Sequence, residues 1–544
     1  MTLSVQEIEN KIWDNLVIGT GIGGSVLGYS LAKHGQSVLF CEKGPSLNES
    51  DLDNKSLITG RFAEEFINKN TENGIHFFYK NSGRFSNYLL DNSQFFPKKL
   101  FPMLGSVTGG SSAIFGMAFE RFFPLDFQPN KYILNSDKTS APLAWPIDYD
   151  EIAPYYLLAE ELFKVKGSSD PLKSCDTFKY QGKINLHPVN LKLYENLKNQ
   201  GLHPYQLPKA YDNLPDCQTC QGYLCAKKCK NDAFKICIAP ALEKFNSKLL
   251  ANCEIIKLQS TKDRVTSALA VYQNQLITLK AHRFILGAGA INTPALLLKS
   301  KSSLWPDGLA NKNKLVGKNL MRHLVDLYSL VLPAELGKTG PHKEIAFNDF
   351  YFRENIKLGS IQSFGSLPPA NAIVQDLIRK QKLNQHHSVA FFIQKFNHLI
   401  SQHIVKITEN STLLAATLED FPYLDNQVSL SKEGHIVIKY KLHNSEINRL
   451  KIFRNKIKFI LKEFHPKKIS LAHKNDLLGH ACGTCRFGYD PEKSVLDKYN
   501  RAHELNNLFV VDASFFPTSG GTNPALTIAA NSLRVANYIL NFNC

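Results

Sequence analysis

The sequence predicts an α/β fold, α+β over the whole chain, in which distant stretches assemble one parallel sheet and an interleaved second domain contains a mostly antiparallel sheet. Three strand–glycine–helix junctions predict the parallel sheet, because this pattern is typical of βαβ units. The strands are expected at 15–18, 283–286 and 508–511, and the helices after them at 25–34, 294–298 and 524–540. Residues 321–470 alternate short polar and apolar runs, which indicates antiparallel strands with one exposed face.

The length and composition indicate an ordinary folded protein with more than one domain. The chain has 544 residues, of which 43% are hydrophobic and 21% charged, so two or more cores are expected. Its formal net charge is +16, but the lysines are scattered and no base-reading or stacking motif accompanies them. We therefore expect no nucleic-acid partner. A peripheral contact with an acidic membrane surface is the more plausible use of the charge.

The sequence shows neither a secretion signal nor a membrane-spanning run. Its first residues include acids and lack a basic start followed by an apolar run and a cleavage site. No stretch reaches the roughly 18 apolar residues that a membrane-spanning helix needs. The expected compartment is therefore the cytoplasm, with membrane association that is at most peripheral.

Residues 13–43 form the first junction and carry a dinucleotide-binding pattern. The run from Gly19 to Gly24 satisfies G-x-G-x-x-G directly after a strand. Gly19 permits the tight turn, Gly21 lets the backbone approach a pyrophosphate, and Gly24 allows close packing of the helix. Glu42 ends the second strand, where a carboxylate accepts hydrogen bonds from the adenosine ribose. This junction predicts an adenine dinucleotide, and by itself it leaves NAD and FAD open.

Three further segments resemble the glucose-methanol-choline (GMC) family of flavin oxidoreductases. They are GSVTGGSS from 105, GAGAINTPALLLKS from 287 and VVDASFFPTSGGTNPALTIAANSLRVA from 510, and the resemblance extends from about 13 to 540. It implies a discontinuous Rossmann-like FAD-binding domain and an interleaved substrate-binding domain. The first would comprise 1–60, 100–125, 217–320 and 475–544, and the second 61–99, 126–216 and 321–474.

The resemblance also implies which residues contact the flavin nucleotide. Members with covalent flavin carry a histidine near the second segment, and none occurs between Gly105 and Phe123, so non-covalent FAD is expected. Small residues suit such contacts because they let the backbone approach the cofactor closely. The expected FAD-contacting residues are Gly19, Gly21, Gly23, Gly24, Glu42, Gly105, Gly109, Gly110, Ser111, Ser112, Gly287, Ala288, Asp512, Ala513, Asn523 and Pro524.

A histidine and an asparagine toward the end of the chain resemble the family's catalytic pair. His480 begins the segment HACGTCRFG, and Asn523 precedes Pro524 at the start of the last helix. Alcohol oxidation removes a hydroxyl proton while hydride leaves carbon for flavin N5, so an imidazole is a suitable base and an amide can hold the oxygen. We therefore expect His480 to be the base and Asn523 to position the substrate. His323 and His503 lack such a motif and are expected to be structural.

Four cysteines are clustered in a short lysine-rich stretch. Cys217, Cys220, Cys225 and Cys229 are separated by two, four and three residues. Closely spaced thiolates bind iron–sulfur clusters or structural zinc. The spacing resembles that of some bacterial sugar dehydrogenases of the family, whose cluster passes electrons to a cytochrome. A disulfide and free thiols are the alternatives.

The leading interpretation is a dehydrogenase that oxidises a CH-OH group of a small-molecule alcohol (a sugar, polyol or sterol-like compound) and passes electrons to a cytochrome or quinone. An oxidase that forms hydrogen peroxide is the close alternative within the family. A flavin electron-transfer subunit without alcohol chemistry would leave His480 and Asn523 without a role. A nicotinamide-dependent dehydrogenase would leave the C-terminal segment unexplained. No recognition motif in the sequence identifies the substrate.

Overall fold

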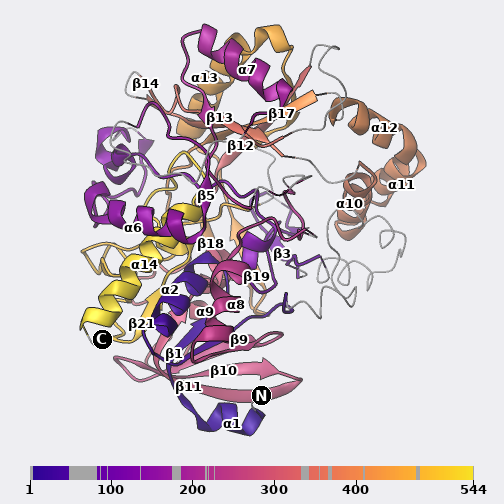
Figure 1. Ribbon diagram of the computed structural model, residues 1–544. Helices are drawn as coiled ribbons and strands as arrows, with labels where there is room; N and C mark the ends of the chain where they lie inside the picture. Colours follow the sequence, from indigo (N-terminus) through magenta and orange to yellow (C-terminus); the bar gives the residue numbers. More distant parts are fainter. Residues whose placement is uncertain are drawn as a thin grey trace.

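The structure is a computed structural model in which two large sheets lie at opposite ends of the molecule (Figure 1). It describes residues 4–542 except for 48–81, 86, 95, 135–136, 174–184, 213, 215–216, 218–219, 226, 332–341, 354–355, 366–369, 409–410 and 473–477. Most of the segment 61–99, which the resemblance assigns to the substrate-binding domain, therefore lies outside the described residues. The marked ends of the chain both lie near the sheet in the lower part of the view (Figure 1).

A seven-stranded sheet contains all three predicted strand–glycine–helix junctions. Its parallel strands have the order β8-β2-β1-β11, and β21 pairs with the last part of β11. Strand β10 pairs antiparallel with the first part of β11, and β9 pairs antiparallel with β10. The long strand β11 therefore joins the parallel part of the sheet to the antiparallel part. The bounds are β1 (Ile12–Ile18), β2 (Val38–Cys41), β8 (Ser247–Leu250), β9 (Glu254–Ser260), β10 (Val265–Tyr272), β11 (Gln275–Leu286) and β21 (Leu508–Val510).

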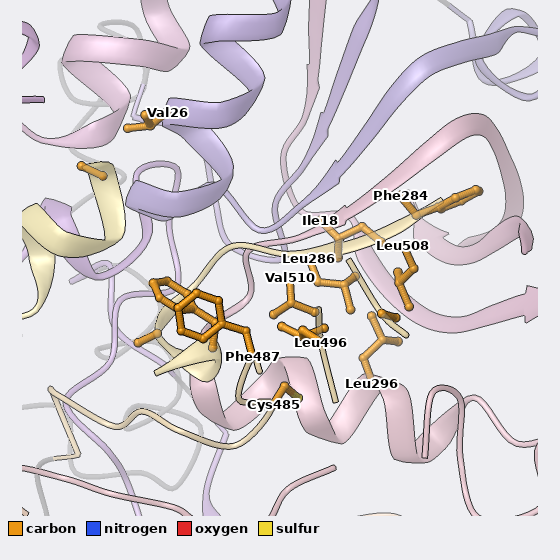
Figure 2. Packing of buried hydrophobic residues seen from close by; sticks show 14 of the residues in the cluster. Ile18, Val26, Phe284, Leu286, Leu296, Cys485, Phe487, Leu496, Leu508 and Val510 are labelled. Atoms are coloured by element: carbon orange, nitrogen blue, oxygen red, sulfur yellow. The ribbon is translucent and has the colours of Figure 1, made fainter. Parts of the chain in front are cut away.

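Helices pack against this sheet and against one another. Figure 2 shows side chains from β1, β11 and β21, such as Ile18, Leu286 and Val510, close to Leu296 of the helix that follows β11. All four are buried, and each such side chain contributes about 1.5 to 3 kcal/mol through removal from water. The long C-terminal helix α14 packs against α2 and α6 (Figure 1). The bounds are α2 (Ile22–Lys33), α6 (Tyr149–Leu162), α8 (Ala239–Lys244), α9 (Gly289–Lys299) and α14 (Ala525–Phe542).

A six-stranded sheet, antiparallel throughout, forms the other end of the molecule. Its order is β20-β12-β17-β16-β13-β6. Leu193 of α7 and Phe453 of α13 share one buried cluster with Leu414 of β17, so both helices pack on this sheet. The two sheets confirm the predicted α/β fold with an antiparallel second sheet. The bounds are β6 (Tyr205–Gln206), β12 (Leu324–Val331), β13 (Ile345–Phe347), β16 (Gly359–Phe364), β17 (Ser411–Leu418), β20 (Lys467–Ser470), α7 (Pro188–Asn199) and α13 (Asn444–Ile460).

The stretch 321–470 contains helices that the prediction of alternating strands missed. Helix α13 buries Leu450, Phe453 and Ile457, a spacing of three or four residues that is helical. Two of the antiparallel strands within this stretch do form, at 427–430 and 436–439, but they pair with each other and join β3 and β4 in a separate four-stranded sheet. The bounds are β3 (Leu89–Asp91), β4 (Lys98–Leu100), β18 (Gln427–Leu430), β19 (Ile436–Lys439), α10 (Ala370–Leu383), α11 (His387–Lys395) and α12 (Asn397–Thr408).

Shorter elements complete the described chain. Two small antiparallel pairs are β5 (Val165–Lys166) with β7 (Lys209–Ala210), and β14 (Phe352–Arg353) with β15 (Ile356–Lys357). A first helix, α1 (Val5–Asn10), precedes β1, and single helical turns include Gly110–Ala113, Phe234–Ile238 and Ala513–Phe515. Across the described residues, no helix combines the length and the apolar character needed to cross a bilayer.

Candidate active site

A cavity of about 670 Å³ opens where the parallel strands of the seven-stranded sheet end. Backbone hydrogen bonds hold these ends together: Gly19 N donates to Cys41 O at 2.9 Å, and Gly287 N donates to Ile18 O at 2.8 Å. The cavity wall includes residues that directly follow β1, β2 and β11, and it includes Asp512, two residues after β21. Carboxyl ends of parallel strands are where α/β sheets bind their ligands.

Glycines at this edge let three backbone segments approach closely. A Cβ on Gly23 would lie 2.1 Å from Val511 O, and one on Gly19, whose φ is +92°, would lie 2.6 Å from Gly287 O. No side chain fits at these two positions without moving the backbone. A Cβ on Gly21 would instead meet only Gly287 O, at 3.6 Å. Gly21 therefore keeps open space on the cavity side, at the uncapped N-terminus of α2, where a phosphate can bind backbone N–H groups.

Glu42 lies buried in the cavity wall at the end of β2. Its Oε2 accepts hydrogen bonds from Thr20 N at 3.1 Å and Thr20 Oγ1 at 2.7 Å, and its Oε1 accepts one from Gly44 N at 2.9 Å. Burial raises the pKa of Glu42, and these hydrogen bonds oppose the rise. The carboxylate is thus fixed beside the glycine turn and has acceptor capacity left for ribose hydroxyls.

Asp512 ties the end of β21 to the start of α9. Its Oδ2 accepts from Gly289 N at 2.9 Å and from Thr293 Oγ1 at 2.5 Å, while its Oδ1 accepts from Ser514 N at 2.9 Å. The residue is buried and lines the cavity, and burial raises its pKa. Asp512 therefore fixes the loop that carries Ala513 against the cavity.

The predicted cofactor residues nearly all meet at this one cavity. Of the sixteen, only Gly24 and Gly109 are absent from its wall. Gly24 packs beneath the turn, where a Cβ would lie 2.3 Å from Gly19 O, and Gly109 N donates to Thr20 Oγ1 at 3.1 Å. The glycine cradle, the fixed carboxylate at the end of β2 and the open helix N-terminus together fit an adenine dinucleotide such as FAD.

His480 and Asn523 line the same cavity although they are far apart in sequence. His480 lies next to a short bridge in which Cys482 N donates to Met321 O at 2.9 Å and Met321 N donates to Cys482 O at 3.0 Å. Continuing this antiparallel register by two residues places His323 opposite His480. The imidazoles are in direct contact, with 2.8 Å between the two Nδ1 atoms. His323, which no motif in the sequence connects with His480, is therefore its direct neighbour.

The hydrogen bonds around His323 fix the proton positions on both rings. Its Nε2 lies 3.1 Å from Ser519 O and 3.0 Å from Gly520 O, and carbonyl oxygens only accept, so Nε2 carries the proton. Burial lowers the pKa of His323 to about 4, so the ring is neutral and its Nδ1 is an acceptor. His480 Nδ1 must then donate, which leaves the lone pair of His480 on Nε2. This assignment follows from the hydrogen-bond network.

Two further groups contact or influence His480 and Asn523, the predicted catalytic pair. Asn523 Oδ1 accepts a hydrogen bond from Gln362 Nε2 of β16 at 2.7 Å, so the Asn523 Nδ2 protons remain available to another oxygen. Burial, with smaller contributions from His323 and Lys343, lowers the pKa of His480 well below its usual value. Lys343 is itself buried, and its own pKa is lowered to about 7 by burial and then by the charge of Lys209. His480 is consequently unprotonated at neutral pH.

The cysteine loop adjoins the cavity wall at Gln221 and Gly222. The thiols interact in pairs: Cys220 with Cys225, and Cys229 with both Cys217 and Cys225. Throughout the described part of the chain, no group of three or more His, Cys, Asp or Glu side chains is arranged to hold a metal ion. The iron–sulfur or zinc site at these four cysteines therefore stays a prediction.

A dinucleotide cradle, a neutral histidine and an asparagine line one cavity, and this combination is that of an oxidoreductase that acts on CH-OH groups. Models of the N- and C-terminal parts of the GMC oxidoreductases match residues 13–325 and 422–532. The chain belongs to this family, as the sequence resemblance predicted, and the family implies FAD as the cofactor.

The chain is similar over its full length to several known proteins. It is 28% identical to 6'''-hydroxyparomomycin C oxidase of Streptomyces lividus, over 97% of the chain and 92% of the relative. It is 25% identical to the fructose dehydrogenase large subunit of Gluconobacter japonicus, over 97% of the chain and 98% of the relative. The crystal structure of pyridoxine 4-oxidase from Mesorbium loti superposes with a TM-score of 0.61 at 18% identity, covering 97% of this chain and 99% of that one, which shows the shared fold.

Proposed function

We propose that this protein oxidises a hydroxyl group of a sugar, polyol or related polar alcohol, with His480 as the base and Asn523 as the residue that positions the hydroxyl oxygen. The observation that carries the proposal is the complementary hydrogen bonding of the pair: a lone pair on His480 Nε2 and free N–H groups on Asn523, both at the cavity that fits FAD. The relatives named as an oxidase of a paromomycin and a dehydrogenase of fructose support a polar, hydroxyl-rich substrate.

Each protein group has one task in this proposal. FAD, held non-covalently by the glycine cradle, supplies the hydride acceptor. His480 Nε2 takes the hydroxyl proton, and Asn523 Nδ2 donates to the same oxygen as negative charge develops there. His323 keeps the proton of His480 on Nδ1 throughout. Pro524 lacks an amide hydrogen and precedes α14, so the positive end of that helix faces the cavity.

Anaerobic bleaching of the flavin absorption by a panel of sugars and polyols tests the proposal. We expect the best substrate to bleach the wild-type flavin, and His480→Ala to slow bleaching by roughly 100- to 10,000-fold, the usual contribution of a general base. Asn523→Asp should also slow it, because a carboxylate cannot donate to the oxygen. His503→Asn is the matched control, since His503 is bound to Ser494 Oγ at 2.9 Å and does not line the cavity. Full activity in His480→Ala would refute the assignment.

The electron acceptor is the second part of the proposal, and we infer a cytochrome or quinone in preference to oxygen. The support is the relative named as a fructose dehydrogenase large subunit and the contact of the cysteine loop with the cavity wall, together with two buried cations beside the loop. Lys209 and Lys230 are buried and make no ion pair with a carboxylate among the described residues. Buried cations are costly unless anions lie near, and the neighbouring thiols, once deprotonated, would supply them.

Oxygen consumption and dye reduction distinguish the two acceptors. A dehydrogenase should reduce a quinone-like dye rapidly with the best substrate and form little peroxide in air. Peroxide formed at the rate of dye reduction would favour the oxidase alternative. A broad visible absorption that remains after the flavin is bleached would show an iron–sulfur cluster, and metal analysis would detect zinc.

A further inference from the structure

Helices α10, α11 and α12 form a unit that projects from the side of the molecule (Figure 1). They lie between β16 and β17 in the chain, and their inner faces make a small core of their own around Val374, Ile378 and Ala390. α10 is also held to the body by Asn384, whose Oδ1 accepts a hydrogen bond from Lys99 N at 2.9 Å. The inner faces of the three helices are therefore already packed.

The outer surface of α11 and α12 carries large apolar side chains that no described part of the chain covers. Phe391 is 67% exposed, Phe392 and Leu399 are each 60% exposed, and Val389 is 45% exposed. These four fall within eleven residues, whereas other exposed large apolar residues of the described chain are scattered singly or in pairs. A contiguous exposed apolar group of this kind marks a surface that contacts another phase or molecule.

The same helical unit is strongly basic. Between residues 370 and 408 it has five lysines and arginines (Arg379, Lys380, Lys382, Lys395 and Lys406) and one acid, Asp376, which gives a net charge of +4 with histidines neutral. No acidic residue occurs from 387 to 406, around the exposed phenylalanines. Protein–protein interfaces are depleted in lysine, while amphipathic helices that lie on membranes combine Phe or Leu with a lysine-rich polar face.

We propose that the outer surface of α11 and α12, called here the helical patch (Val389, Phe391, Phe392, Lys395, Leu399 and Lys406), binds the surface of an anionic lipid bilayer. The apolar side chains enter the interface between headgroups and acyl chains, and the lysines contact the lipid headgroups. The charge of the patch complements the negative surface of such a bilayer. The inference is independent of the proposed substrate and acceptor, and it would place the holoenzyme at the membrane surface.

Co-sedimentation of the holoenzyme with vesicles tests this proposal. We expect binding to phosphatidylcholine vesicles that contain phosphatidylglycerol, weak binding to pure phosphatidylcholine, and release at high salt. Replacing Lys395 and Lys406 by Gln should lower the partition coefficient by roughly five-fold for each residue. Phe391→Ser with Phe392→Ser should abolish binding, while flavin bleaching by alcohol is unchanged.

A fluorescence experiment on conservative variants guards against misfolding. Phe391→Trp should shift its emission to shorter wavelength when anionic vesicles are added. Phe459→Trp is the matched control, because Phe459 is 72% exposed on a different helix, α13, and its emission should not shift. Equal shifts at both positions, or no binding to either kind of vesicle, would overturn the proposal. A further outcome would also overturn it: the wild-type protein does not bind vesicles and is a dimer, and the double serine variant is a monomer. The helical patch would then join two copies of the chain.

Discussion

Replacing His323 by leucine tests whether this residue sets the proton positions on His480. In the wild-type chain the buried Nδ1 of His323 accepts the hydrogen bond from His480 Nδ1 at 2.8 Å. Leucine would leave that N–H without an acceptor, which costs about 1 to 3 kcal/mol, so His480 moves its proton to Nε2. At about 1.4 kcal/mol per factor of ten, the form able to take a proton falls by roughly 5- to 150-fold, and kcat falls equally.

The assay is the rate of anaerobic flavin bleaching by the best alcohol across pH. The loss should persist on the high-pH plateau because tautomer balance does not depend on pH, and KM should change little because Nε2–H still bonds the hydroxyl. His323→Asn places an amide oxygen near the former Nδ1 and should recover most of kcat. Equal rates for His323→Leu and the wild type, or equal losses for the leucine and asparagine variants, would refute the reasoning. FAD content and melting temperature verify folding in each case.

Three further predictions concern the cradle, the base and acid stability. Gly23→Ala should lower the melting temperature, because its Cβ would lie 2.1 Å from a carbonyl oxygen. Gly21→Ala should fold normally and lose FAD during gel filtration. Full FAD retention by Gly21→Ala would contradict the prediction that the backbone at Gly21 approaches the cofactor. Lys343→Met should move the acid limb of the pH profile of kcat/KM to higher pH, because removing a positive charge raises the pKa of His480. An unchanged acid limb would show that the charge of Lys343 does not influence His480. The pKa of His323 is about 4 in the folded chain and about 6.5 in the unfolded chain. As the pH falls, the unfolded chain therefore binds a proton at His323 before the folded chain does. The stabilisation of the folded state by the neutral ring is fully present only above pH 6.5. The free energy of unfolding should therefore fall by about 3 kcal/mol between pH 6.5 and 4, and urea titrations should show a smaller fall in His323→Asn.

Local sequence patterns were sufficient where the structure depends on the backbone of a few neighbouring residues. The turn from Gly19 to Gly24 needs a positive φ at its start and no Cβ where β21 approaches, and both requirements are met by glycine alone. Helical period was equally visible in α13, yet the alternating runs around it led to a prediction of strands only. The spacing of Leu450, Phe453 and Ile457, which repeats every three or four residues, predicts this helix.

The sequence by itself therefore predicted the class of fold, the dinucleotide turn and the two residues proposed as the catalytic pair, because each is encoded by adjacent residues or by family segments. Only the tertiary structure decided what those residues contact. His323 meets His480 across 157 residues through one antiparallel bridge, and Gln362 reaches Asn523 from the second sheet. Long-range strand register and burial set these contacts, and the contacts in turn set the pKa and the tautomer of His480. Local sequence patterns predict neither the register nor the burial.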